Sequence, residues 1–329
     1  MNKMEVNKPF TIGVLTSGGD SPGMNAAIRA VVRTANTRNA DVLGVVDGYE
    51  GLLNGEFRHL GARDVSGILQ RGGTILQTSR SPRFKEQKGQ REAIRRMNEA
   101  GMDALIVIGG EGSLNGAYAL HQQGVKVIGL PGSIDNDVWG TDISIGTDTA
   151  MNTIMDSVDK LRDTASSHRR AFLIETMGRN CGYLAVMAGI VCGAESVLIP
   201  EVHVTVKEVG KVIEDAYTRG KTHAIIINAE GSGHNTTELA NALEAMDVGF
   251  TTRVTILGHI QRGGSPTAYD RLLASRMGVK AVEALLEGKS GVMTGLKGHH
   301  IEFVPLEEVI SHKRTANLEY YEMTRTLAR

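Results

Sequence analysis

Short apolar runs, each containing or ending at a glycine, are the clearest pattern along the chain. They occupy residues 10–19, 104–110, 125–132, 171–178, 224–231 and 254–260. A strand of a parallel sheet is covered on both faces, so its sequence is nearly all apolar rather than alternating. We therefore expect six buried parallel strands, with tight turns or close backbone contacts at the glycines that follow them.

Stretches with a helical period separate these runs. Between residues 150 and 164, five apolar side chains recur at the spacing of one helix face: Met151, Ile154, Met155, Val158 and Leu161. Strand and helix alternating over 329 residues predict a doubly wound α/β protein, long enough for two domains, with sites at the carboxyl ends of its strands.

Two further signals concern the organisation of the chain. A domain break is predicted near Gly146, because Thr147 or Asp148 can cap the helix that follows. Residues 291–303 combine turn-like glycines with weak alternation, which predicts an antiparallel ribbon.

Composition narrows the functional classes. The 36 Lys and Arg residues nearly balance the 37 Asp and Glu residues. The chain therefore has no large net charge that would favour nucleic acid or an acidic membrane as a partner. Cys181 and Cys192 lack the spacing of a metal motif, which fits a reducing compartment. The start of the chain lacks the apolar core of a signal peptide, and no apolar run approaches the ~20 residues of a membrane span. We expect a cytoplasmic protein.

Two glycine turns are candidate phosphate sites. After the first apolar run, TSGGDSPGMN (16–25) leads into a helix expected to begin near Gly23, and the backbone N–H groups there could bind an anion. An ordinary strand-to-helix turn explains this piece equally well.

The second turn is IGGEGSLNG (108–116). Its glycines at 110, 112 and 116 are one residue too widely spaced for the dinucleotide fingerprint GxGxxG, which weakens a dinucleotide site without excluding it. No GxxxxGK[ST] phosphate loop occurs either. Glu111 could hold Mg2+ through its carboxylate or through a water. The alternative is a solvated surface acid.

The segment PGSIDND (131–137) brings two acids together. In an extended segment the side chains of Asp135 and Asp137 would point the same way. Like charges at that distance raise a pKa, which suits a site where one carboxylate accepts a proton and the other faces a metal. A pair of Asx turns at a strand end is the alternative.

Basic residues near the strand ends supply the opposite charge. They are Arg80, Arg170, Arg179, Arg253, His259 and Arg262. Arginine can clamp a phosphate with two N–H groups, and phosphoryl transfer needs positioning and charge neutralisation more than covalent chemistry. Each of these arginines taken singly fits a surface charge, but together with the acids they predict a phosphoryl-transfer site.

Six motifs occur together and in order: TSGGDSPGMN, RGGT, GGEGS, PGSIDND, MGR and GHIQRGGSP. With them the chain resembles the 6-phosphofructokinase family of bacterial type over nearly its whole length. The resemblance implies transfer of the γ-phosphate of ATP to the 1-hydroxyl of fructose 6-phosphate, with Mg2+. It also implies two similar three-layer α/β/α, Rossmann-like domains with mostly parallel sheets, the active site in the cleft between them, and a homotetramer. The implied domains are 1–146 plus 261–311 for ATP, and 147–260 plus 312–329 for the sugar phosphate.

The resemblance also assigns roles to residues. Asp135 would be the general base, Asp137 would support the metal and the reacting centre, and Ser133 would contact the moving phosphoryl group. Arg80 and Arg179 would stabilise charge in transfer. The positions that match the nucleotide site are Gly19, Tyr49, Arg80, Ser81, Glu111, Gly112, Ser113 and Gly116. Gly19 also belongs to the catalytic set, and Glu111 would be the metal ligand. The positions that match the sugar-phosphate site are Ser133, Asp135, Met177, Gly178, Arg179, Glu230, His259 and Arg262, together with Arg170 and Arg253, which correspond to arginines from a neighbouring subunit.

Departures from the family pattern refine these expectations. Glu111 and Ser133 stand where the family usually has Asp and Thr, so we expect activity with altered magnesium or ATP affinity. Pyrophosphate-dependent relatives carry Asp and Lys where this chain has Gly112 and Gly132, so the glycines favour ATP.

An effector site for ADP or phosphoenolpyruvate is also implied by the resemblance. The matching positions are Arg29, Arg33, Arg162, Lys221 and His223, with Glu195 near a magnesium ion. Arg63 stands one place beyond the expected arginine position, which Ala62 occupies. A basic helix face explains Arg29 and Arg33 without any effector.

Three alternatives remain open at this stage. The first is a pyrophosphate-dependent phosphofructokinase. The second is an NAD(P)-dependent oxidoreductase, suggested by the glycine turn at 109–116. The third is a catalytically inactive nucleotide sensor, against which the joint presence of Asp135, Asp137, Arg80 and Arg179 argues.

Overall fold

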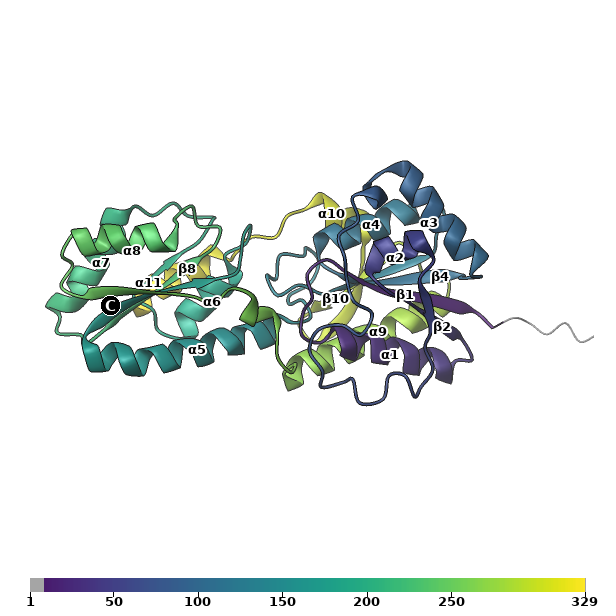
Figure 1. The fold of residues 1–329 in the computed structure, drawn as a ribbon, viewed down its shortest axis with the longest axis horizontal. Helices are drawn as coiled ribbons and strands as arrows, with labels where there is room; N and C mark the ends of the chain where they lie inside the picture. Colours follow the sequence, from purple (N-terminus) through teal and green to yellow (C-terminus); the bar gives the residue numbers. More distant parts are fainter. Residues whose placement is uncertain (1–8, 329) are drawn as a thin grey trace, which may run out of the picture. The chain divides into compact units, whose positions relative to one another are not determined.

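The chain folds into two units, each built around its own sheet, in the computed structural model, which describes residues 9–328 (Figure 1). Unit 1 contains the described residues through Ser133, then Val138–Gly146 and Gly264–Lys313. Unit 2 contains Ile134–Asp137, Thr147–Gly263 and the described residues from Arg314 onward. The chain therefore first enters unit 2 at Ile134, inside the PGSIDND segment.

Unit 1 has a seven-stranded sheet. In spatial order its strands are β11 (His300–Pro305), β10 (Val292–Lys297), β5 (Val127–Pro131), β4 (Ala104–Gly109), β1 (Thr11–Ser17), β2 (Asp41–Val45) and β3 (Phe57–His59). The inner pairs are parallel, whereas β10–β11 and β2–β3 are antiparallel.

Helices cover both faces of this sheet. On one face lie α1 (Met24–Thr37) and α9 (Ala268–Leu286); on the other lie α2 (Gly48–Asn54), α3 (Gln87–Glu99), α4 (Glu111–His121) and α10 (Leu306–Ser311), with the short helix η1 (Arg83–Lys85). Successive residues of β1 pack into opposite cores: Val14 packs with α1 and α9, and Leu15 with α2, α3 and α4. The three layers follow from this burial on both faces.

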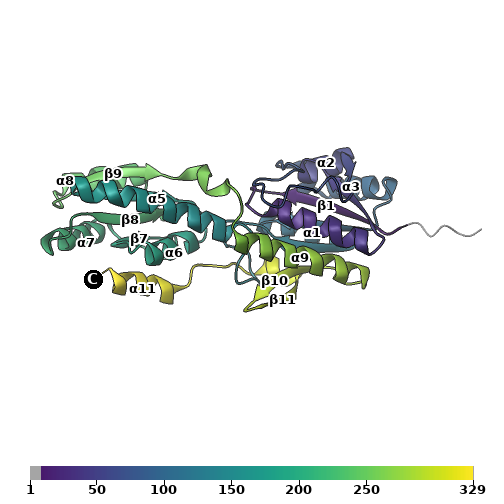
Figure 2. The same cartoon turned by 90° about the horizontal axis from the view of Figure 1, so that it is seen from below.

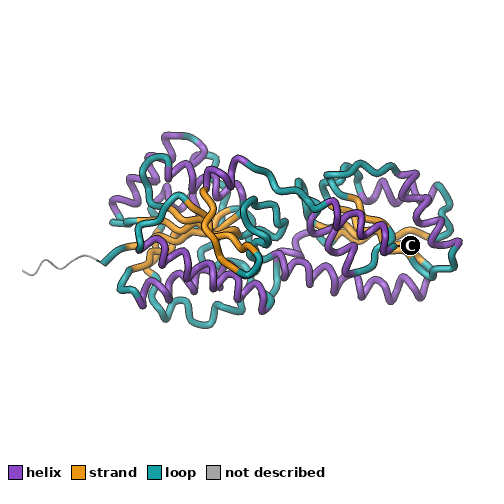
Figure 3. Tube along the Cα trace, turned by 180° about the vertical axis from the view of Figure 1, so that it is seen from behind, coloured by secondary structure: helices purple, strands orange, loops and turns teal. Residues whose placement is uncertain are grey.

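Unit 2 repeats the arrangement with fewer strands. Its sheet contains, in spatial order, β7 (Ser196–Leu198), β8 (Ala224–Ala229), β6 (Arg170–Thr176) and β9 (Thr251–Ile256), all parallel. One face carries α5 (Thr147–His168), α6 (Tyr183–Val191) and α11 (Leu318–Leu327); the other carries α7 (Val206–Thr218) and α8 (Thr236–Ala245), and η2 (Gly258–Arg262) follows β9. Figures 2 and 3 show the strands of each unit flanked by helices.

The predicted architecture is confirmed, with three strands added. Five of the six apolar runs contain buried strands, and residues 292–305 form the antiparallel ribbon β10–β11. The sixth run, 254–260, was only partly right. It holds the last three residues of β9 and continues into η2, and β9 is not buried as expected because it lies at the edge of its sheet, where Ile256 is exposed. The sequence analysis missed β2, β3 and β7. The helix predicted at 150–164 extends over Thr147–His168, and Ile154 and Val158 are buried on it as expected. Met155 is 36% exposed and was wrongly placed on the buried face, because it lies a third of a turn from Ile154, at the margin of the apolar stripe.

Two smaller observations complete the fold. Both cysteines are free thiols in buried positions, and burial raises the pKa of each to about 11. Within residues 9–328, no helix combines the length and apolar composition that crossing a bilayer requires.

Candidate active site

The glycine turns after β1 and β4 lie side by side in unit 1, because these two strands are hydrogen-bonded neighbours. Ser113, at the start of α4, fills the space between them. A Cβ atom added to Gly109 would lie 2.5 Å from the Ser17 carbonyl oxygen and 2.6 Å from Ser113 Oγ. One added to Gly18, at φ +87°, would lie 3.1 Å from the same Oγ. Side chains at these positions would force the two turns apart.

Two helices begin at this carboxyl edge of the unit 1 sheet. Helix α1 starts after Gly23, as predicted, and α4 starts after Gly110; neither cap residue offers a side-chain hydrogen bond. Apart from its chain neighbours and the backbone of α4 itself, no atom of the described residues lies within 4 Å of a Cβ added to Gly112. The first turn of α4 is therefore open, and open N–H groups at a helix start favour an anion such as phosphate.

Tyr49 supports the α4 turn from beneath rather than standing at the surface. It is 6% exposed, its hydroxyl donates to the Ser113 carbonyl oxygen (2.6 Å), and its ring stacks on Phe84 with centroids 4.0 Å apart. A Cβ atom added to Gly116 would lie 2.6 Å from the Tyr49 ring. Burial raises the pKa of Tyr49 above its ordinary value, so the phenol stays protonated and donates. Gly116 is needed because the ring occupies the space of any side chain.

The segment that carries Arg80 is held against the same edge. Thr78 Oγ1 donates to the Gly18 carbonyl oxygen (2.9 Å), and Ser79 Oγ donates to that of Asp47 (2.9 Å). Ser81 Oγ donates to Glu50 Oε2 (2.6 Å). The backbone on both sides of Arg80 is thus fixed, while its side chain remains exposed to solvent.

In unit 2 the carboxyl ends of three adjacent strands carry the predicted sugar-phosphate residues. Because β6 pairs with both β8 and β9, the segments that follow the three strands share one edge. They hold Met177, Gly178 and Arg179 after β6, Glu230 after β8, and His259 and Arg262 on η2 after β9. Arg179 Nε lies 3.8 Å from Glu230 Oε1. The structure therefore places these six predicted residues at one edge of the unit 2 sheet.

The acids of the PGSIDND segment belong to unit 2, but they do not lie on an extended strand. Ile134 and Asp135 form a turn, and Asn136 has a left-handed backbone with φ 51°. The expectation of an extended segment was wrong, because the strand stops at Pro131 and Asn tolerates the left-handed turn.

Asp135 has the electrostatic environment of a proton acceptor. Burial, and after it the carboxylates of Asp137 and Glu230, raise its pKa, whereas Arg262 and Arg179 lower it; together they bring the pKa to about 6. Its Oδ1 is shielded from solvent and accepts no hydrogen bond from the described residues. A carboxylate that ionises near pH 6 and has a vacant acceptor atom can take a proton from a bound hydroxyl at neutral pH.

Two predicted arginines lie elsewhere in the unit. Arg170 is the first residue of β6, whereas Met177 follows its end, so the seven-residue strand separates them by roughly 20 Å. Arg253 lies within β9, the edge strand, and its guanidinium donates to the Thr252 carbonyl oxygen (2.7 Å). Within one chain, Arg170 therefore does not lie with the residues at the carboxyl edge of the unit 2 sheet.

The predicted effector residues of unit 2 meet at the opposite, amino edge of the sheet. Lys221 Nζ lies 3.0 Å from Glu195 Oε1, and Arg162 approaches His223 Nε2 at 3.5 Å. Glu195 is 7% exposed, and its Oε2 accepts from the Ile225 N–H (2.5 Å). Burial lowers the pKa of His223 below its ordinary value; Arg162 and Lys221 lower it too, and Glu195 opposes them. Arg29 and Arg33 belong to α1 of unit 1, one turn apart.

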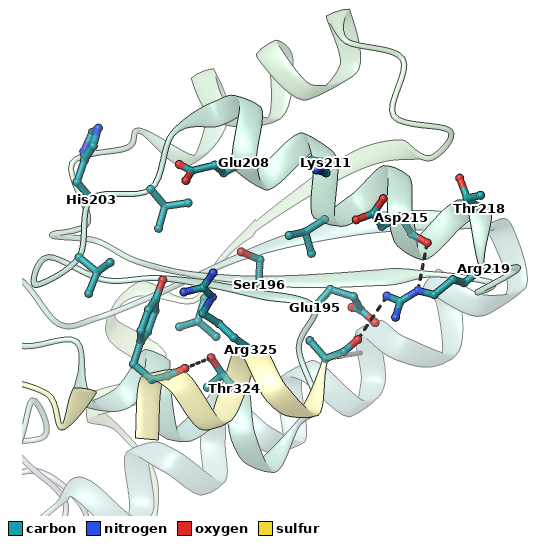
Figure 4. A pocket seen from close by; sticks show the side chains of 16 residues that line it. Glu195, Ser196, His203, Glu208, Lys211, Asp215, Thr218, Arg219, Thr324 and Arg325 are labelled. Atoms are coloured by element: carbon teal, nitrogen blue, oxygen red, sulfur yellow. Dashed lines mark hydrogen bonds between the residues drawn. The ribbon is translucent and has the colours of Figure 1, made fainter. Parts of the chain in front are cut away.

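A cavity of about 780 Å3 adjoins this amino-edge group (Figure 4). Side chains of α7 and α11 face each other across it, with Glu195 and Arg219 at one end. Arg219 and Lys221 both donate to the carbonyl oxygen of Ala328, at 3.5 and 3.2 Å. Sequence reasoning missed Arg219 and Ala328, because nothing in the sequence signals that the end of α11 returns to the start of β8.

A magnesium ion fits the donors of unit 1. Among the described residues no group of three or more His, Cys, Asp or Glu side chains could hold a metal by itself. Mg2+, however, keeps several waters and needs only one or two carboxylates beside phosphate oxygens. Glu111 offers a hard carboxylate donor at the open first turn of α4, next to Gly112.

Sequence and structure comparisons find similar proteins over nearly the whole chain. A sequence model described as Phosphofructokinase matches residues 11–285. The ATP-dependent 6-phosphofructokinase of Thermotoga neapolitana is 51% identical over 318 residues, covering 96% of this chain and 99% of that protein. The protein of the same name from Clostridium acetobutylicum is 51% identical over 319 residues, which cover 97% of this chain and 99% of that protein. Phosphofructokinase from Saccharomyces cerevisiae has a TM-score of 0.85 and 41% identity over 92% of this chain, which spans 45% of the yeast chain.

The raised pKa of Asp135 can be measured directly. In metal-free buffer, we expect its carboxyl 13C resonance, assigned by its loss in Asp135→Asn, to titrate with a midpoint near pH 6. Asp137→Asn removes a like charge and should lower that midpoint. Asp159→Asn, on the exposed face of α5, serves as the control and should leave it unchanged. A midpoint near the ordinary 3.8 in the native protein would contradict the assignment.

Proposed function

Because the chain belongs to the phosphofructokinase family, we propose that it transfers the γ-phosphate of ATP to the 1-hydroxyl of fructose 6-phosphate, a step of glycolysis in the cytoplasm. One observation supports this proposal above the others. Asp135 combines a pKa near 6 with an enclosed, unpaired oxygen, and arginines act on it from the same unit. This is what the base of a phosphoryl transfer requires.

In the proposed reaction, Asp135 accepts the proton of the sugar 1-hydroxyl. The oxygen forms a bond to the γ-phosphorus, the bond from that phosphorus to the bridging oxygen breaks, and ADP leaves. Arg80 and Arg179 neutralise charge that develops on the phosphoryl group, and Ser133 and Gly19 contact it. Asp137 keeps the pKa of Asp135 raised and supports the reacting centre.

The carboxyl edge of unit 2 would bind the sugar phosphate. His259 and Arg262 on η2 would bind its charged and polar groups, Glu230 would accept from its hydroxyls, and the Met177–Gly178 backbone would line the site. Support comes from the shared edge of β8, β6 and β9, which brings these residues together. Arginine and imidazole suit phosphate, and a carboxylate suits sugar hydroxyls.

The open first turns of unit 1 would bind the nucleotide. Gly19, Arg80, Ser81, Gly112, Ser113 and Gly116 would contact ATP, and Tyr49 would support the α4 turn beneath it. Glu111 would hold Mg2+ beside the phosphate oxygens, where the ion would neutralise phosphate charge. The longer Glu side chain, in place of the family's Asp, reaches one methylene further from the backbone.

The glycines at 112 and 132 support ATP rather than pyrophosphate as the donor. The space above Gly112 is open, so a nucleotide can approach the backbone. A Cβ atom added to Gly132 would lie 3.3 Å from Met24 Cε and 3.5 Å from the Gly109 nitrogen. A lysine there, as in pyrophosphate-dependent relatives, would need Met24 to move.

A neighbouring copy of the chain would complete the sugar-phosphate site. Arg170 starts β6, a strand length from Met177, and Arg253 is exposed on the edge strand β9. Ile256 on the same edge is 56% exposed. An open strand edge with exposed apolar residues is a liability for an isolated chain. We therefore assign Arg170 and Arg253 to a site of another subunit in a homotetramer.

The amino edge of unit 2 would bind a phosphorylated effector, ADP or phosphoenolpyruvate. Arg162 and Lys221 provide two cations there, and a cavity of about 780 Å3 adjoins them. An anion would compete with Glu195 for Lys221. Arg29 and Arg33 of α1 would contribute from a neighbouring subunit, and Glu195 would stand near a magnesium ion.

A coupled assay tests the main proposal. We expect turnover with fructose 6-phosphate, ATP and magnesium, a strong preference for ATP over pyrophosphate, and loss of turnover on chelation. Asp135→Asn should lower kcat by about 10²–10⁴-fold, because the hydroxyl loses its base. Asp159→Asn is the matched control and should keep full activity. Pyrophosphate preference, or an Asp135→Asn variant with native turnover, would refute the proposal.

Hybrid oligomers test whether the site is shared. Arg170→Ser and Asp135→Asn should each be nearly inactive alone. If a neighbour supplies Arg170, coexpression restores sites that pair an intact Asp135 with an intact Arg170. In a random assembly, half of the sites have an intact Asp135, and half of those have a neighbour with an intact Arg170. About a quarter of all sites should then be intact. No recovery of activity in the hybrids would mean that each chain uses its own Arg170.

Effector binding can be separated from catalysis. Lys221→Met should weaken the response of the fructose 6-phosphate saturation curve to ADP and to phosphoenolpyruvate. Lys221 is placed outside the catalytic machinery, so kcat without effector should not change. Lys207→Met, on α7 but outside the lining of the cavity, is the control. An unchanged response in Lys221→Met would place the effector elsewhere.

A further inference from the structure

Gln261 is a buried side chain between two residues to which the proposed function gives a role. It lies on η2 with His259 and Arg262, yet it is 0% exposed. In a 3-10 helix, residues three apart lie on the same side, so His259 and Arg262 share one side of η2. Gln261 projects elsewhere, into the interior of unit 2. Its burial prevents it from reaching a ligand itself.

The Gln261 amide joins two segments of the sugar-phosphate edge. Its Oε1 accepts from the Met177 N–H (3.2 Å), and its Nε2 donates to the Gly258 carbonyl oxygen (3.0 Å). The β6–β9 ladder ends just before this point, where the Leu257 N–H donates to the Glu175 carbonyl oxygen (3.1 Å). The side chain of Gln261 thus continues the connection between the two strands beyond their backbone pairing.

The loop Met177–Arg179 is held from its other side by the segment after β8. The Gly231 N–H donates to the Gly178 carbonyl oxygen (3.3 Å), and a Cβ atom added to Gly231 would lie 1.9 Å from the Arg179 carbonyl oxygen. Gly178 itself has φ +123°, a backbone conformation that residues other than glycine rarely adopt. The loop is therefore fixed between Gly231 on the β8 side and Gln261 on the β9 side.

We propose that Gln261 is a positioning residue for sugar-phosphate binding: its amide locks the Met177–Arg179 loop to η2 and so sets the spacing between Arg179 and Arg262. Two phosphate-binding or charge-stabilising arginines on separate segments bind one small ligand well only if their separation is constant. Without the amide, the buried Met177 N–H loses its acceptor and the loop and η2 can shift apart. This inference rests on the proposed function, because that function identifies the ligand.

Three variants test the proposal by steady-state kinetics. Gln261→Met keeps the length of the side chain and removes both hydrogen bonds. We expect it to raise KM for fructose 6-phosphate about tenfold, since a buried donor is left unpaired, and to change KM for ATP by less than about twofold. Gln261→Glu keeps an acceptor for the Met177 N–H and should recover part of the loss. Gln123→Met, which removes an amide bonded to Gln90 and Ala119 in unit 1, is the matched control and should change neither constant.

The outcomes separate positioning from a merely structural role. An unchanged KM for fructose 6-phosphate in Gln261→Met would overturn the proposal, as would equal losses for both substrates or a Gln261→Glu variant no better than Gln261→Met. If Gln261→Met does not fold, the same comparison is made with Gln261→Asn, whose amide is one methylene too short to keep the bond to the Met177 N–H; a sugar-specific rise in KM supports the proposal and native constants overturn it. Failure of the proposed function is recognised separately, because the native protein would then show no turnover with fructose 6-phosphate.

Discussion

Burial of both sheets on both faces is the constraint on which the rest of the structure depends. Val14 and Leu15 of β1 enter different cores, as do Ile225 and Ile226 of β8. On the inner strands the helix layers leave no face where a ligand could lie, so the polar chemistry of those strands is confined to their ends. At those ends the backbone must turn into a helix or loop, and the glycines of the chain concentrate there. The same constraint that makes the strands apolar therefore places the candidate sites.

The electrostatics of Asp135 illustrate how an edge site can sustain a costly charge. Burial, Asp137 and Glu230 all oppose its ionisation, whereas Arg262 and Arg179 favour it. The balance leaves a pKa of about 6, above that of a solvated carboxyl group. Because Arg179 and Glu230 stand on separate loops, this balance depends on the relative positions of the segments after β6 and β8. Any change that loosens those loops would alter both the proposed binding groups and the proposed base.

The long-range architecture followed from the sequence, but several local features did not. Buried parallel strands such as β4 and β8 are nearly all apolar, and this pattern was sufficient to locate them. The three missed strands are short or weakly apolar: β7 has three residues, β3 begins a turn-rich segment, and β2 contains Gly44. The site residues of unit 2 came from motifs, whereas Gln261 and Ala328 act through contacts between distant segments that no local pattern records. The turn at Asp135 was misread because its residue types also fit an extended segment.

The parallel strands of unit 2 run from its amino edge to its carboxyl edge. They cannot carry the effect of a ligand from one edge to the other by changing their own length or shape. Strand β8 starts just after Lys221 and His223 and ends just before Glu230, and β6 runs from Arg170 to the residue before Met177. Both strands are paired on both sides, and a close-packed, hydrogen-bonded sheet does not stretch to accommodate a ligand. An anion that draws Lys221 away from Glu195 would therefore act on the distant edge by moving the sheet as a rigid element. In the proposed homotetramer, the effect would reach other subunits through the surfaces that carry Arg253, which is exposed, and Arg170, which is half-buried. Under that proposal, regulation and completion of the site would both be consequences of the same assembly.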